Sequence, residues 1–74
     1  MATKTFKSEH HRNGSIKATT NKNKVTFLIC DNDYSFDTTN SEHWKKMDWL
    51  LFENTSSYYT EQILNWVKSK TNNF

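Results

Sequence analysis

The feature that most constrains this chain is a change in the spacing of its apolar residues near residue 40. Before that point, short runs rich in β-branched and aromatic residues are separated by Asn, Asp and Gly, which is typical of strands and turns. After it, apolar residues recur every three or four positions, as on one face of a helix. Strands followed by helices predict an α+β fold, in which helices cover one face of an antiparallel sheet.

The first part of the chain, residues 1–40, is predicted to form a β-rich meander of three to four strands. Its strongest turn signal is Asn13–Gly14, because a two-residue type I′ turn needs positive φ at both central positions. This turn predicts a hairpin between residues 3–11 and 15–20, in which His11 lies opposite Ile16.

The next strand is predicted at Val25–Cys30, a run of β-branched and aromatic residues. A tight turn at Asn32–Asp33 would join it to a further strand at Tyr34–Thr38. This register places Ile29 opposite Phe36.

Two helices are predicted within residues 41–70. The first runs from Ser41 to about Glu53, and the second from Tyr58 to about Lys70. The segment 48–53 is also compatible with a short strand, because periodicity does not separate the two over so few residues. The last residues, 71–74, are expected to fray.

The whole chain, residues 1–74, is predicted to be one domain with a small core of large side chains. Hydrophobic residues make up 34% of it, which is low, but aromatic residues make up 15%. Aromatic rings bury much area per residue, so few of them are enough for a core. The predicted core is Val25, Phe27, Ile29, Phe36, Met47, Leu51, Ile63, Trp66 and Val67.

A single cysteine, Cys30, excludes an internal disulfide and favours a reducing compartment. The first residues, Met-Ala-Thr-Lys-Thr-Phe-Lys, lack the apolar run of about 7–15 residues that a secretory signal needs. The longest apolar runs, 27–30 and 49–52, are far shorter than a membrane span of about 18 residues. We therefore expect a soluble, cytoplasmic protein with no membrane contact.

The segment 31–42 resembles a calcium loop of the EF-hand kind. Oxygen-bearing side chains fall at its positions 1, 3, 5, 7 and 9, and Glu42 stands at position 12. The resemblance covers only these twelve residues, and the family has Gly at the sixth position, where this chain has Phe36. The family also has a helix before the loop, where this chain predicts a strand. These departures favour a polar turn leading into a helix, and no metal is predicted.

No other part of the sequence combines the residues that a catalytic site would need. One glycine cannot form a phosphate-binding loop. His10 and His11 are adjacent and would point to opposite faces of a strand, His43 is distant in sequence, and Cys30 has no assignable base. A chain of 74 residues also rarely encloses the pocket that tunes acid–base pairs. We expect no enzymatic activity, no cofactor and surface histidines.

The aromatic surplus points to binding instead. Trp49, Phe52 and Tyr58 fit neither predicted helix stripe, and Trp and Tyr carry much of the energy of protein interfaces. The first hypothesis is therefore a protein-interaction module that regulates or inhibits an unidentified protein partner, or forms a homodimer through these residues. Compact proteins of this composition include phage and mobile-element inhibitors of host machines. An anti-CRISPR protein is one concrete form.

The alternative hypothesis is nucleic-acid binding by a basic N-terminal hairpin. Residues 1–24 carry a net charge of +5 and residues 25–53 one of −4. Cations on a two-stranded ribbon can contact phosphates, although the chain holds no nucleic-acid-binding motif. The residues concerned are Lys4, Lys7, Arg12, Lys17, Lys22 and Lys24.

Overall fold

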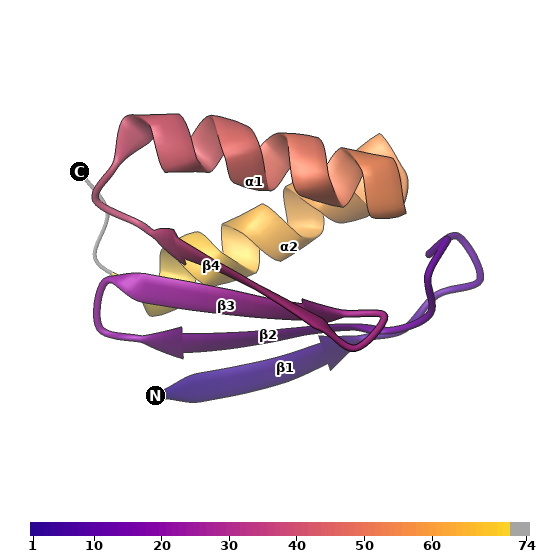
Figure 1. Cartoon of the computed structure of the whole chain (residues 1–74), viewed down its shortest axis with the longest axis horizontal. Coiled ribbons are helices and arrows are strands. Elements are labelled where there is room, and N and C mark those ends of the chain that lie inside the picture. The colour runs from indigo at the N-terminus through magenta and orange to yellow at the C-terminus, as the bar shows by residue number, and fades with distance from the viewer. Residues whose placement is uncertain (72–74) are drawn as a thin grey trace.

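The computed structural model describes residues 1–71 and has two layers, a four-stranded antiparallel sheet and two helices that cover one of its faces (Figure 1). Strands adjacent in the chain are adjacent in the sheet, so the sheet is a meander. This confirms the predicted α+β fold. The elements are β1 (Ala2–Phe6), β2 (Ile16–Asn21), β3 (Lys24–Ile29), β4 (Asn32–Asp37), α1 (Ser41–Asn54) and α2 (Ser57–Lys70).

The two central strands supply the sheet side of the core. Successive residues of a strand point to opposite faces, so alternate residues of β2 and β3 face the helices. On that face Ile16 and Ala18 of β2 and Val25 and Phe27 of β3 have no exposed surface. The opposite face of the sheet is polar and exposed, with Lys17 and Leu28 as one of its residue pairs.

The helices begin at capped positions. The Asn40 side chain accepts a hydrogen bond from Glu42 N at 2.9 Å, and the Ser56 side chain accepts one from Tyr59 N at 3.4 Å. Such caps satisfy backbone N–H groups that have no partner within the helix. The segment 48–53 lies inside α1 and is therefore helical. Neither helix of residues 1–71 is long and apolar enough to span a membrane.

Most of the predicted core is confirmed. Seven of the nine predicted residues are buried, whereas Phe36 and Trp66 are only partly buried and pack against the cluster. Ile16 and Ala18 belong to the buried cluster although the prediction left them out. Both lie on the helix-facing side of β2. The polar composition of this strand did not indicate that it is a central strand of the sheet.

The predicted hairpin turn at Asn13–Gly14 is wrong. In the structure β1 ends at Phe6, Phe6 pairs with Ile16, and residues 7–15 form a nine-residue connection. A strand register follows from which side chains must share the buried face. Here Phe6 joins Ile16 on that face and packs edge-on against Trp66, with ring centroids 5.9 Å apart.

The predicted turn at Asn32–Asp33 is also misplaced. The turn lies at Cys30–Asp31, with φ values of 52° and 65°, and Ile29 pairs with Asn32. Phe36 therefore lies opposite Val25 rather than Ile29. Positive φ at both central positions matches the twist of a two-residue hairpin, and these two residues adopt it without a glycine.

The predicted fraying of residues 71–74 concerns mainly residues outside the described range. Thr71 is described and caps the end of α2, where its Oγ1 donates to Val67 O at 2.8 Å.

Candidate protein-interaction surface

Two large aromatic side chains of α1 lie outside the core. The helix turns Met47, Leu51 and Asn54 inward, and this leaves Trp49 and Phe52 on its outer side. Their exposed fractions are 66% and 53%. Residues three apart are neighbours on a helix surface, so Trp49 and Phe52 form one aromatic patch.

Tyr58 is exposed too, but at a separate place. It lies in the first turn of α2 and is 62% exposed. Its ring contacts Tyr59 edge-on, with centroids 5.2 Å apart. The structure thus brings Trp49 and Phe52 together, and it records no ring contact between Tyr58 and either of them among residues 1–71.

A groove between α1 and α2 adjoins the patch. It has a volume of about 440 Å³, and its walls include Trp44 and Phe52 of α1 and Thr60 and Leu64 of α2. This groove was not predicted from the sequence. The signal was present in the spacing, because 44, 48 and 52 are four residues apart and lie on one side of α1.

His11 is buried, which corrects the expectation of surface histidines. The long connection 7–15 folds onto the junction between α1 and α2, where His11 Nδ1 shares a hydrogen bond of 2.7 Å with Thr55 Oγ1. Burial lowers the pKa of His11 below its ordinary value, and the neighbouring His10 lowers it further. The ring of Tyr59 packs against His11, with centroids 5.3 Å apart. No sequence signal marked this contact, because it joins positions 44 residues apart.

The same connection makes further bonds to the helix junction. Arg12 N donates to Asn54 O at 2.8 Å, and the Asn13 side chain bonds the side chain of Asn54. Asn54 Nδ2 in turn donates to Leu50 O at 2.8 Å. The buried Asn54 side chain is thus satisfied within the chain, whereas His11 Nε2 at the same junction has no hydrogen-bond partner within residues 1–71.

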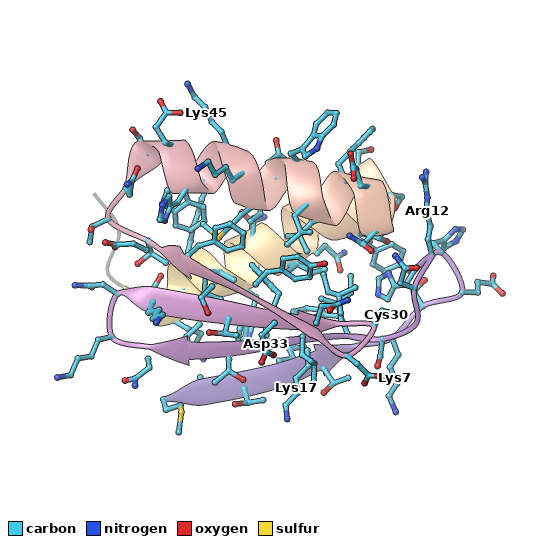
Figure 2. The ribbon with its side chains drawn as sticks, in the orientation of Figure 1. Lys7, Arg12, Lys17, Cys30, Asp33 and Lys45 are labelled. Carbon is cyan, nitrogen blue, oxygen red and sulfur yellow. The ribbon has the colours of Figure 1, made fainter. Side chains whose placement is uncertain are left out.

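The six basic residues named for nucleic-acid binding are spread over the molecule. Figure 2 shows Arg12 beside the helix layer, whereas Lys7 and Lys17 extend on the far side of the sheet. Lys4 lies on the helix-facing side of β1, and its Nζ lies 5.1 Å from the centroid of the Phe6 ring. The other two, Lys22 and Lys24, lie at the turn between β2 and β3. Nucleic-acid binding therefore stays a prediction from sequence.

The segment that resembles a calcium loop becomes strand, turn and helix start. Asp37 Oδ1 accepts hydrogen bonds from Thr39 Oγ1 at 2.7 Å and Thr39 N at 2.9 Å. These bonds, chiefly the one from the Thr39 side chain, lower the pKa of Asp37. Among residues 1–71, no three His, Cys, Asp or Glu side chains gather where they could hold a metal ion.

Comparison of the chain with known protein families, with curated proteins and with solved structures found no match.

Proposed function

We propose that this protein is a non-enzymatic protein-interaction module that binds another protein through the outer side of its helix layer. The exposure of Trp49 beside Phe52 carries this proposal. Burying a large aromatic side chain removes about 150–250 Å² from water, and Trp is prominent among the residues that dominate interface energies.

The completeness of the core supports the proposal. The buried cluster and the side chains packed against it include neither Trp49 nor Phe52 nor Tyr58. Core packing therefore does not account for these three residues. A regulator or inhibitor of a host machine, such as an anti-CRISPR protein, is the finer form of the proposal. It is supported by small size and composition, and the single thiol of Cys30 suits a cytoplasmic setting.

The test compares two variants of the full chain used as bait in a lysate of its source. Trp49→Ala/Phe52→Ala removes the aromatic patch, and Tyr34→Ala is the matched control, because Tyr34 is a partly exposed aromatic residue of the sheet. We expect the double variant to lose the captured protein while the control retains it. Sedimentation velocity on the wild type shows whether the partner is a second copy.

Equal capture by both variants would contradict the proposal. So would a loss of several kcal/mol of stability in the double variant, because that size of effect marks a core residue.

A further inference from the structure

The groove between α1 and α2 has a floor that is mainly apolar. It is lined entirely by helix residues, so it opens away from the sheet. Trp44 and Leu64 are half-buried on its floor, and Phe52 stands at one end with 53% of its surface exposed. From Trp44 to Phe52 the helix rises about 12 Å, at about 1.5 Å per residue. A segment that filled the groove would therefore contact it over about two helical turns.

A buried hydroxyl on the groove wall lacks a partner. Thr60 is 3% exposed, and its Oγ1 has no hydrogen-bond partner among residues 1–71. A buried polar group without a partner is destabilising, which makes such groups uncommon in folded proteins. Residues 1–71 therefore leave one polar atom unsatisfied at this wall.

The walls carry carboxylates from both helices. Asp48 of α1 and Glu61 of α2 line the groove, are exposed, and form no ion pair or hydrogen bond within residues 1–71. The end of the groove at Trp44 is different, because it is lined by Lys45 and by Lys68, whose Nζ lies 5.6 Å from the Trp44 ring centroid. The groove thus places two cationic groups near one end and the carboxylates of Asp48 and Glu61 farther along it, where they complement a basic side chain.

The walls also restrict the conformation of an occupant. Both walls are helices, whose backbone groups are paired within the helix. An extended peptide on this floor would therefore find no backbone partners for its own N–H and C=O groups. A helix satisfies those groups internally and presents only side chains, as in the known helix-in-groove mode of peptide recognition.

We propose that this groove binds an amphipathic helix of a partner protein. Its apolar stripe covers Leu64 and Phe52, and a basic side chain beside the stripe reaches between Asp48 and Glu61. This inference rests on the proposed protein-binding function, and it names the class of segment that is bound. Trp49, next to Phe52 on α1, then lies at the rim of the contact.

The probe is a fluorescein-labelled helical peptide of about 14 residues, with leucines at positions i, i+3, i+4 and i+7 and lysines beside them. A matched peptide carries glutamates in place of the lysines. Fluorescence anisotropy measures binding to the full chain and to two charge-reversal variants. Asp48→Lys/Glu61→Lys changes the groove, and Asp33→Lys/Glu53→Lys makes the same change in net charge outside it, at exposed positions.

We expect the lysine peptide to bind and the glutamate peptide to bind at least about tenfold more weakly. The groove variant should raise the Kd of the lysine peptide about tenfold, and the control variant should leave it within about twofold. Absence of binding by the lysine peptide, or an equal loss in both variants, would overturn the inference.

Capture of a protein from the lysate by the groove variant and by a further variant, Trp49→Ala, separates this inference from the proposed function. If Trp49→Ala abolishes capture of a protein from the lysate but Asp48→Lys/Glu61→Lys does not, protein binding stands and the groove inference is wrong. If the wild type captures nothing and does not self-associate, the proposed function is itself wrong. The inference about a partner helix then fails with it.

Discussion

The helix junction and the outer groove are two regions of one helix layer that each include buried polar residues, and they differ in whether another segment of the chain covers them. At the junction, Asn54 and Thr55 are 8% and 2% exposed, and the connection 7–15 bonds to both of them. On the groove side Thr60 is as deeply buried, but its Oγ1 has no hydrogen-bond partner within residues 1–71; at the junction this holds for one buried side-chain atom, His11 Nε2. The difference shows that a buried polar side chain does not always contribute hydrogen bonds to the fold. What matters is whether a second segment of the chain supplies its partner.

The aromatic residues of the two regions differ in the same way. At the junction, Tyr59 packs against both His10 and His11, with ring centroids 5.8 and 5.3 Å apart. On the outer side, Trp49 and Phe52 stay exposed. The connection 7–15 therefore covers one region from within the chain, and the other region is the one we assign to a partner. Four predictions test this contrast.

The largest expected effect is at Asn54. Asn54→Ala removes the hydrogen bonds of its buried side chain to Asn13 and to Leu50 O, which join the connection 7–15 to α1. We expect a loss of about 2 kcal/mol in the free energy of unfolding, measured by urea titration. The control Asn65→Ala, at an exposed position of the groove, should change it by less than about 0.5 kcal/mol. If Asn54→Ala and Asn65→Ala lowered the free energy of unfolding equally, the proposed difference between the junction and the groove would be wrong.

The same substitution at two threonines should act in opposite directions. Thr55→Val removes the partner of His11 Nδ1 and should destabilise the fold by about 1–2 kcal/mol. Thr60→Val replaces a buried hydroxyl that has no partner and should stabilise the fold by up to about 1 kcal/mol. Both residues are β-branched like valine, so side-chain stiffness changes little. A change of the same sign at both positions would contradict this interpretation of Thr60.

The stability of the junction should depend on pH through His11. Because burial lowers its pKa below the ordinary value of 6.5, His11 stays neutral in the fold at a pH where the unfolded chain already binds a proton. The free energy of unfolding is therefore highest above about pH 6.5 and falls as the pH drops toward the lower pKa of the folded state. Below that pKa this contribution no longer changes.

Urea titrations from about pH 7.5 to pH 5 measure this dependence. His11→Gln should flatten it, and His10→Gln should retain most of it, because burial of His11 is the larger cause of the shift. An unchanged pH profile in His11→Gln would show that another group is responsible.

The smallest expected effect on stability is on the outer side. Trp49→Ala and Phe52→Ala should each change the free energy of unfolding by less than about 0.5 kcal/mol, because both side chains are more than half exposed. Thermal melting of the full chain is the measurement. A large loss in the free energy of unfolding at either position would show that the residue stabilises the fold rather than serving an interface.

The helices could be predicted closely because their signals are local. Predicted bounds of 41–53 and 58–70 differ by one residue from the observed Ser41–Asn54 and Ser57–Lys70. The regularly spaced apolar residues and the capping residues lie within the helix itself or next to it. The strand registers could not be predicted as well, because they depend on contacts far along the chain. The position of Phe6 opposite Ile16 accompanies its packing on Trp66, sixty residues away.

The candidate site was predicted only in part. The sequence showed that Trp49, Phe52 and Tyr58 fall outside the helix stripes, and the structure shows all three exposed. The sequence indicated at most the α1 wall of the groove and not the groove itself, because Trp44 and Leu64 come from different helices and meet only when these pack. Nor did it indicate the burial of His11, which depends on the docking of a polar connection.

The sequence by itself determined the order of strands and helices, the inward faces of β3 and of the two helices, and the surplus of aromatic side chains. These follow from the spacing of apolar residues, which acts over a few positions. Only the tertiary structure decided the strand registers, the docking of residues 7–15 on Asn54 and Thr55, and the groove that remains open. Each depends on which distant segment covers a given surface, and a pattern of near neighbours does not contain that information.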